Sequence, residues 1–462
     1  MTFLSARRTV AACALSAAAA AAFVAPGASN ASLGSQCSGA NIGGQGSSLQ
    51  KLAQEVWRAG FNASAEKHAC NGTQGTKALP TIAYNPSGSG AGLKSWGVGK
   101  TEHKYEATNA FIGTDEAPSP TALAEIEENE TTITPQSVAT VPVLQAAVAV
   151  IVHLPEKCVA TSSAAKGRLV LNNATLEKIW RAEITKWSEI TEGGDKVTGS
   201  GCNAETAIQH VVRQDGSGTT HIFKKYLGLI NKAGTFDATN ASGTDVGLRT
   251  WDEIAEGSEN TTWPTADAVL RPANKGGGEL VELVAKTASS IGYANVADAR
   301  ANKAFIPAPG GTGGANTATF WVEVQNKEGT VTYADPATNK EVDALKESNC
   351  AKEEYTNGVV AFPPESVKES WSAVTTKTSE PHYTICGLTF DLALLPYGLF
   401  SGTSLEEATT VNNYLQFVVS TTKEKEGNKM NGGQALIKNH DYEPLVGTVL
   451  SEAKKGTALV SF

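Results

Sequence analysis

Residues 207–222 read Ala-Ile-Gln-His-Val-Val-Arg-Gln-Asp-Gly-Ser-Gly-Thr-Thr-His-Ile, and this stretch decides the fold class. A strand pattern over 207–212 runs into a Gly/Ser/Thr turn, and a helix is expected over 222–227. In an α/β fold such a turn lies at the carboxyl end of a strand, where ligands bind. Its backbone N–H groups stand at a helix N-terminus, which attracts anions. Arg213 adds a planar fork of donors suited to an oxyanion, and Asp215 is placed to orient it through a salt bridge.

Two further turns have the same form. Residues 46–50 precede a helical pattern, and residues 87–94 follow a strand pattern over 79–84. A lone turn of this kind is typical of ordinary helix capping, because Ser and Thr are common N-caps. Three such turns in one chain, one of them with an arginine, favour an anion site. A further strand, Phe111 to Thr114, ends at Asp115, which taken alone is typical of a turn former.

Strand and helix patterns alternate along the chain, which predicts an α/β fold with parallel sheets. Helices are expected over 49–58 and 279–286, and Thr175 is expected to cap a helix that ends at Trp180. The segment from Val141 to Leu154 is one apolar run, too long for an ordinary strand. It is either a strand pair or a single strand that crosses between two lobes.

Composition bounds the class of protein. The chain has 462 residues, which is enough for two to three domains of ordinary size. Apolar residues make up 41% and charged residues 18%, so large buried cores are expected and a disordered chain is excluded. Lys and Arg total 38 against 47 Asp and Glu, a formal net charge of −9. Nucleic acid is therefore not an expected partner, since binding it needs clustered positive charge.

Residues 1–31 have the form of a secretory signal peptide. Two arginines at positions 7 and 8 make a positive start, residues 11–25 are apolar and Ala-rich, and Ser29 to Ala31 offers a small-x-small cleavage site. Val10 to Cys13 resembles a lipobox, but almost no apolar run precedes it, so a lipid anchor at Cys13 is the weaker interpretation. No other segment is apolar for about eighteen residues in a row. We therefore expect an exported, soluble mature chain in the periplasm, outside the cell or associated with the cell envelope.

The cysteines agree with export. One of the seven lies in the signal segment, and the remaining six are an even number that allows fifteen disulfide connectivities. A zinc site is the alternative, but no CxxC or clustered Cys/His spacing supports it. Sequential pairing is favoured, partly because Cys37 and Cys70 each precede a strand-like run and so lie at the same ends of adjacent strands. The expected pairs are Cys37–Cys70, Cys158–Cys202 and Cys350–Cys386.

Five segments together resemble the phosphate-binding proteins of ABC phosphate uptake systems. The turn at Arg213–Thr220 is similar to that family's RxDGSGT signature. The other four segments are Tyr84–Lys94 (YNPSGSGAGLK), Phe111–Asp115 (FIGTD), Leu176–Trp187 (LEKIWRAEITKW) and Ser289–Tyr293 (SSIGY). Any one of them is weak evidence, but their order and spacing match the family from about residue 37 to 300.

The resemblance implies a two-lobed type II periplasmic-binding-protein fold, in which each lobe is a mixed, mostly parallel sheet flanked by helices. Lobe one is expected to comprise residues 32–143 and 291–462, and lobe two residues 144–290, joined by two crossing strands. Residues 317–380 do not match the family and are interpreted as an insertion in the C-terminal third. Members of the family bind inorganic phosphate between the lobes and deliver it to the membrane permease subunits of an ABC importer. The resemblance implies no cofactor, no metal and no catalysis, and we expect a monomer.

The resemblance also implies a set of ligand residues. In the first loop the family usually has Thr-Phe where this chain has Ser48-Leu49, and only the backbone N–H of Leu49 can serve there. The expected phosphate site consists of Ser48, Leu49, Ser89, Asp115, Arg213, Asp215, Ser217, Gly218 and Thr219. Arg213 pairs with the anion, and the last three residues donate from a helix N-terminus.

A carboxylate at Asp115 makes sense in an anion site because phosphate at neutral pH still carries a proton. Phosphate can donate that proton to the carboxylate, whereas sulfate has none to donate. An unpaired buried carboxylate facing an anion is costly, so Asp115 is expected to exclude sulfate. A site built to pair a ligand hydroxyl rejects an analogue that lacks it by about 10⁴-fold or more.

Three other functions compete with this interpretation. A phosphatase would need a nucleophile and a base, and Ser217 lies near His221, but the sequence lacks a G-x-S-x-G elbow and positions 217 and 221 are ordinary neighbours on a helix. A second alternative is a binding protein for another oxyanion or a phosphorylated ligand, since fold does not fix function. A third is an adhesion or sensor protein, for which the insertion at 317–380 is the only support.

Overall fold

The fold is that of a computed structural model. It describes residues 33, 36–67, 80–100, 108–128, 137–160, 169–190, 197–202, 206–231, 234–257, 260–266, 268–305, 318–326, 332–337, 348–351, 355–356, 371, 375–376, 381–421 and 432–462. Residues 1–31, the expected signal peptide with Cys13, therefore lie outside the described residues. None of the helices within these ranges is long and apolar enough to cross a membrane.

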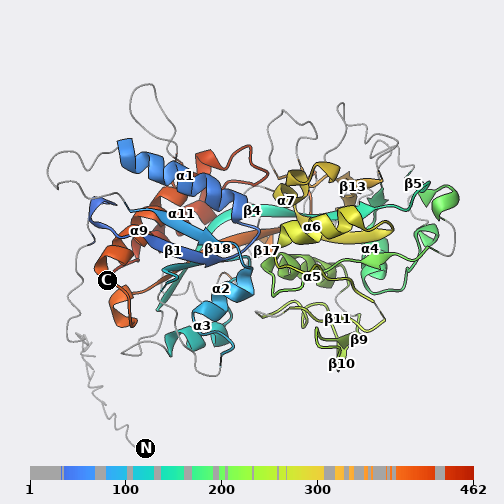
Figure 1. Ribbon diagram of the computed structural model, residues 1–462, viewed down its shortest axis with the longest axis horizontal. Coiled ribbons are helices and arrows are strands. Elements are labelled where there is room, and N and C mark those ends of the chain that lie inside the picture. Colours follow the sequence, from blue (N-terminus) through green and yellow to red (C-terminus); the bar gives the residue numbers. More distant parts are fainter. Residues whose placement is uncertain are drawn as a thin grey trace, which may run out of the picture.

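One mixed sheet of eight strands runs through the molecule (Figure 1). Pairing is parallel at its two ends, β2–β1–β3 and β12–β8, and antiparallel in the middle, where β18, β4 and β12 meet. The strand order is β2 (Ile82–Asn85), β1 (Ile42–Gly46), β3 (Phe111–Thr114), β18 (Cys386–Leu394), β4 (Val138–His153), β12 (Ser290–Asn295) and β8 (Gln209–His210), and β13 (Thr319–Trp321) also pairs with β4.

The strand β4 joins the two halves of this sheet. It has 16 residues, and all but the last are buried. Its first part, residues 138–147, pairs with β18, and its second part, residues 148–153, pairs with β12. At about 3.3 Å per residue it spans roughly 50 Å. The apolar run at Val141 to Leu154 is thus one crossing strand, not a strand pair, and Figure 1 shows β4 along the long axis of the molecule.

Helices cover both faces of each half of the sheet. In Figure 1, α1 and α11 lie above and α2 and α3 below the half with β1, while α7 lies above and α5 below the other half. The helix α6 is drawn across the strands of that half and contacts β12 and β4. The helices are α1 (Lys51–Lys67), α2 (Ser89–Ser95), α3 (Pro120–Glu127), α4 (Asn173–Trp180), α5 (Gly218–Ile230), α6 (Gly277–Lys286), α7 (Val296–Ala301), α9 (Leu405–Val418), α10 (Gly433–Leu436) and α11 (Gly447–Ala458). Short 3-10 helices span Gln36–Ser38, Trp187–Glu189, Ser200–Cys202, Lys303–Phe305 and Tyr397–Leu399.

Smaller sheets surround the central one. One contains β9 (Phe236–Thr239), β10 (Asp245–Arg249) and β11 (Trp263–Pro264), and another contains β6 (Val170–Leu171), β14 (Glu323–Gln325) and β15 (Tyr333–Ala334). Two-stranded pairs are formed by β5 (Val159–Ala160) with β7 (Val197–Thr198), and by β16 (Tyr355–Thr356) with β17 (Thr375–Thr376).

The expected helices exist, but their starts differ from the predicted ones: α1 and α6 by two residues, and α4 and α5 in their caps. The cap of α4 is Asn172, whose side chain accepts a hydrogen bond from the Thr175 N–H, so Thr175 is not the cap. The helix α5 begins at Gly218 instead of residue 222, with Ser217 as its N-cap. This correction matters because it places the first turn of α5 directly on the Gly/Ser/Thr turn.

Part of the expected insertion belongs to the central sheet and part to a smaller one. The strand β13 pairs with residues 151–153 of β4 on the edge opposite β12, and β14 pairs in parallel with β6 in a separate smaller sheet. Much of 317–380 lies outside the described residues. The division into residues 32–143 plus 291–462 and 144–290 stays a prediction.

Two of the expected disulfides are present. Cys158 pairs with Cys202, and Cys350 pairs with Cys386 at the start of β18. Cys37 is also disulfide-bonded, while its expected partner Cys70 lies outside the described residues. These disulfides are typical of a protein that folds in an oxidising compartment.

Candidate anion site

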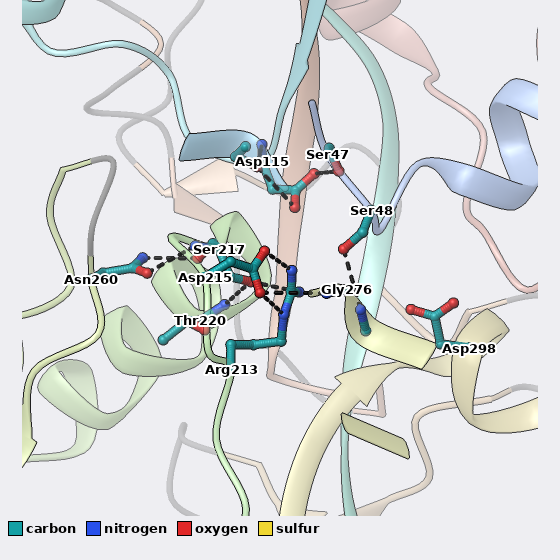
Figure 2. A network of polar contacts seen from close by, with 12 residues as sticks. Ser47, Ser48, Asp115, Arg213, Asp215, Ser217, Thr220, Asn260, Gly276 and Asp298 are labelled. Atoms are coloured by element: carbon teal, nitrogen blue, oxygen red, sulfur yellow. Dashed lines mark hydrogen bonds and ion pairs between the residues drawn. The ribbon is translucent and has the colours of Figure 1, made fainter. Parts of the chain in front are cut away.

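The predicted turns converge at one place, where the two halves of the sheet meet (Figure 2). The strands β1, β2 and β3 are parallel, so the turns that follow them emerge at the same edge. Ser47 and Asp115 come from that edge and face Arg213, Asp215 and Ser217 from the turn before α5. All nine residues predicted for the site are described, and they lie in these turns or at the helix starts that follow them.

Asp115 is buried and heavily hydrogen-bonded. Its Oδ1 accepts bonds from the hydroxyls of Ser47 and, at 2.9 Å, Thr389 of β18. The Ser89 hydroxyl lies 3.4 Å from Oδ2 and accepts the Asp115 N–H at 3.2 Å. Burial raises the pKa of Asp115 to about 6, while the bonds from Ser47 and Thr389 and the charge of Arg213 lower it. The carboxylate is thus mostly ionised at neutral pH and able to accept a ligand proton.

The start of α5 packs against Asp115. At Gly218, a side-chain methyl group would lie 2.8 Å from both Oδ2 and Cα of Asp115, so this contact needs a residue without Cβ. The N–H groups in the first turn of a helix have no acceptor within the helix. The hydroxyl of Thr219 is also buried, and no described residue bonds to it. The first turn of α5 therefore offers hydrogen-bond donors beside a carboxylate.

Arg213 is held by the chain itself. Its guanidinium donates Nε to Asp215 Oδ1 at 2.8 Å and Nη2 to Oδ2, which is the predicted salt bridge, and Nη1 donates to the Ser217 hydroxyl at 2.8 Å. Only 2% of Arg213 is exposed. A guanidinium has five N–H groups, so two remain that no described residue engages.

A loop that the sequence analysis missed supports the turn before α5. The side-chain amide of Asn260 accepts the Ser217 N–H at 3.0 Å and donates to the Ser217 carbonyl at 2.8 Å. The buried Nζ of Lys224 donates to the carbonyls of Ile254, Asn260 and Thr262 and so fixes this loop on α5. Burial lowers the pKa of Lys224 well below its usual range.

The first loop reaches across to α6. The Ser48 hydroxyl accepts the Gly277 N–H at 3.3 Å, and Asp215 Oδ1 lies 3.4 Å from the Gly276 nitrogen. Gly276 has φ of 111°, a left-handed conformation that favours glycine. Leu49 is buried, and its carbonyl accepts the Tyr442 hydroxyl at 2.7 Å. The chain's own acceptors therefore engage one N–H group at the start of each helix, Gly277 in α6 and Thr220 in α5.

Sequence reasoning did not predict several residues that the structure places at the site, and its set of ligand contacts stays a prediction. Ser47, not Ser48, bonds to Asp115, although both lie in the same predicted turn. Thr389 and Asn260 carried no local signal. Asp298, which accepts a bond from Asn295 at 2.7 Å beside the start of α6, was not predicted either (Figure 2). Burial raises the pKa of Asp298 to about 6.

Ser217 and His221 do not form a nucleophile–base pair. The Ser217 hydroxyl bonds to Arg213 and to the Thr220 N–H, whereas His221 Nδ1 lies 3.0 Å from the Ala255 carbonyl and 3.0 Å from Glu116 Oε2. A hydroxyl held in this way is not activated by the histidine. The observation that suggested a phosphatase is thereby explained without catalysis.

The sequence matches the PBP superfamily domain over residues 43–355. This match covers more than half of the 462 residues, so the chain belongs to the PBP superfamily. No curated protein matches the chain.

Several solved structures of phosphate-binding proteins have the same fold as this chain. A phosphate-binding protein from Stenotrophomonas maltophilia is 15% identical with a TM-score of 0.57, over 90% of this chain and 93% of that one. A human phosphate binding apolipoprotein is 18% identical with a TM-score of 0.54, over 90% and 94% of the two chains. A high affinity periplasmic phosphate-binding protein bound with phosphate is 17% identical with a TM-score of 0.52, over 90% and 93%. At such low identity these similarities show the fold, and they confirm the expected two-lobed type II fold.

Proposed function

We propose that the protein binds inorganic phosphate between its two lobes, with high affinity, and delivers it to the permease subunits of an ABC importer. It acts outside the cytoplasm, as a monomer, without a cofactor and without changing its ligand. The proposed contacts are Ser48, Leu49, Ser89, Asp115, Arg213, Asp215, Ser217, Gly218 and Thr219, with Asp215 acting through Arg213. The superfamily match and the three similar phosphate-binding proteins support this proposal.

The observation that carries the proposal is that one buried carboxylate, that of Asp115, lies among hydrogen-bond donors. Asp115 packs against the first turn of α5. The backbone N–H groups and the buried Thr219 hydroxyl of that turn are hydrogen-bond donors that favour an anionic ligand. If the anion carried no proton, it and the Asp115 carboxylate would be two negative groups in contact with no hydrogen bond between them. A phosphate that carries a proton satisfies both the donors and the carboxylate. The chemistry of the site therefore favours phosphate over sulfate.

A calorimetric titration of ligand-stripped protein with phosphate and with sulfate tests this selectivity. Wild type should bind phosphate and reject sulfate by about 10⁴-fold or more. Asp115→Asn should bind phosphate more weakly and gain sulfate binding, because an amide can donate to an anion. Asp335→Asn is the matched control, since Asp335 is also buried and its carboxylate accepts the indole N–H of Trp321 on β13 at 3.1 Å. Equal binding of the two anions by wild type would overturn the proposal.

A further inference from the structure

A buried carboxylate, Glu116, lies beside the half-buried imidazole of His221 next to the anion site, and the two form an ion pair when His221 is protonated. The same His221 Nδ1 lies 3.0 Å from the Ala255 carbonyl, so the contact with Glu116 is electrostatic and not a hydrogen bond. Glu116 Oε2 lies 3.0 Å from His221 Nδ1, and the side chains are 8% and 18% exposed. Glu116 directly follows Asp115, and its carbonyl accepts the Thr114 hydroxyl at 2.9 Å. His221 lies on α5, one helical turn after the N-cap Ser217. Neither residue belongs to the proposed ligand contacts.

The pair connects the two sides of the site. Glu116 is fixed to the end of β3, the side that carries Asp115, and His221 is fixed to the helix whose first residue, Gly218, packs against Asp115. In the predicted division of the chain, Glu116 falls in lobe one and His221 in lobe two. Glu116 is the residue after Asp115, and His221 lies three residues after Gly218. Their contact therefore limits how closely the Asp115 carboxylate approaches the hydrogen-bond donors in the first turn of α5.

We propose that the Glu116–His221 ion pair is a positioning contact that holds the start of α5 against Asp115 when the lobes come together on phosphate. This inference rests on the proposed function. Part of the phosphate affinity then comes from an interaction that does not touch phosphate. Because the pair forms only after phosphate has bound and the lobes have closed, breaking it should leave the association rate of phosphate nearly unchanged. It should increase the dissociation rate of phosphate.

The charges around the pair give it a pH dependence. Burial alone lowers the pKa of His221, but Glu116, Glu256 and the Ala255 carbonyl raise it by more, and the net shift is upward. Burial raises the pKa of Glu116, and Glu256 adds to this, whereas His221 and Lys225 lower it. Lys225 itself pairs with Glu256 at 2.8 Å and Asp252 at 3.3 Å. Separating the lobes removes Glu116 from His221 and lowers the pKa of His221.

The sign of the linkage follows. Because His221 has the higher pKa in the bound state, phosphate binding takes up a proton there. While Glu116 stays ionised, the contribution of the pair is complete below the pKa of free His221 and is lost as the pH rises through the bound-state value. At low pH it is lost again when Glu116, whose pKa burial raises, takes up a proton. Asp115 and phosphate itself also change protonation in this pH range. The contribution of the pair is therefore measured as the difference in phosphate affinity between wild type and a variant without the pair, at each pH.

The test combines two variants with their double mutant. Glu116→Gln and His221→Asn should each weaken phosphate binding at pH 6.5 by about tenfold, mainly through faster dissociation, and the double mutant should be no weaker than the weaker single variant. The difference from wild type should shrink as the pH rises. His153→Asn is the control for His221→Asn, because His153 Nδ1 also contacts a backbone carbonyl, that of Val284, at 3.2 Å.

A second measurement uses wild-type protein alone, so it does not depend on whether a variant folds. The chain has 7 histidines, so the His221 imidazole can be followed by NMR as the pH is changed, with and without phosphate. Phosphate should raise the pKa of His221. Phosphate binding with an unchanged His221 pKa, or with wild-type affinity in both variants, would overturn this inference and leave the proposed function standing. Absence of phosphate binding by wild type would overturn both.

Discussion

Arg213, a proposed phosphate contact, is held in one orientation by its own turn. Asp215 fixes the plane of its guanidinium through Nε and Nη2, and Ser217 holds Nη1. A planar fork fixed in this way loses little conformational entropy when an oxyanion arrives. The same contacts explain why a buried arginine is tolerated, since its charge is paired within the turn.

Arg213→Lys should therefore weaken phosphate binding although it keeps the positive charge. Lysine lacks the planar fork and cannot satisfy Asp215 at two points, so we expect a loss of about 100-fold in affinity, equivalent to roughly 2–3 kcal/mol. Calorimetry measures this loss. Arg181→Lys is the matched control, because Arg181 pairs with Glu177 and Glu183 at the end of α4, away from the site. Wild-type affinity in Arg213→Lys would show that Arg213 has no direct contact with the anion.

Asp391 gives a prediction about stability and pH. Burial raises its pKa to about 7, from an ordinary value near 4, against the hydrogen bonds of Gln54 and Gln50, which lower it. Because the pKa is higher in the folded than in the unfolded state, the folded protein binds the proton more tightly between these values. The contribution of Asp391 to stability is therefore largest at low pH and falls as the pH rises from about 4 to about 7.

In Asp391→Asn this fall is absent. The melting temperature of the variant minus that of wild type should increase between pH 5 and pH 8, and then level off. Thermal unfolding of ligand-free protein at several pH values measures it. Parallel curves for the two proteins would mean that Asp391 is not protonated in the folded state within this range.

At the scale of single elements, α5 is the helix on which the proposed site depends. Its first turn combines an N-cap serine, a glycine in contact with Asp115 and a threonine whose buried hydroxyl no described residue engages. Asn260 and Lys224 fix the loop beside it. The geometry of the anion site is thus set by where α5 starts.

Gly218→Ala tests this contact. The added methyl group would overlap Asp115, so the two sides of the site cannot approach and phosphate affinity should fall by at least tenfold. Calorimetry with phosphate measures the loss. Gly278→Ala in α6 is the control, because a methyl group there meets nothing within 4 Å, and it should bind phosphate as wild type does. Unchanged affinity in Gly218→Ala would contradict the proposed role of the α5 start.

The elements also show what the sequence can and cannot predict. The turns around Ser48, Ser89 and Arg213 were predictable because strand, glycine and helix-cap signals lie within a few residues. An all-apolar run such as 141–154 has no period, so it could not distinguish one crossing strand from two. The bond from Thr389 to Asp115 spans 274 residues and depends on β18 lying beside β3, which no local pattern indicates. The cap at Asn172 was missed because Asn and Thr are both good N-caps.

At the scale of the whole molecule, β4 passes through both halves of the sheet, and the site lies where they meet. A ligand that contacts both sides binds the folded protein and not the unfolded chain. Phosphate at about 1,000 times its Kd should then stabilise the protein by about 4 kcal/mol and raise its melting temperature. Sulfate at the same concentration should not. Equal shifts with both anions would indicate a nonspecific salt effect.

The central claim is that this site binds phosphate and rejects an anion without a proton. The most direct measurement is equilibrium binding of labelled phosphate to ligand-stripped wild type at pH 7.5, with and without millimolar sulfate. The account predicts one phosphate per chain and an affinity that sulfate leaves unchanged. No bound phosphate in a folded sample, or displacement of phosphate by sulfate, would contradict it.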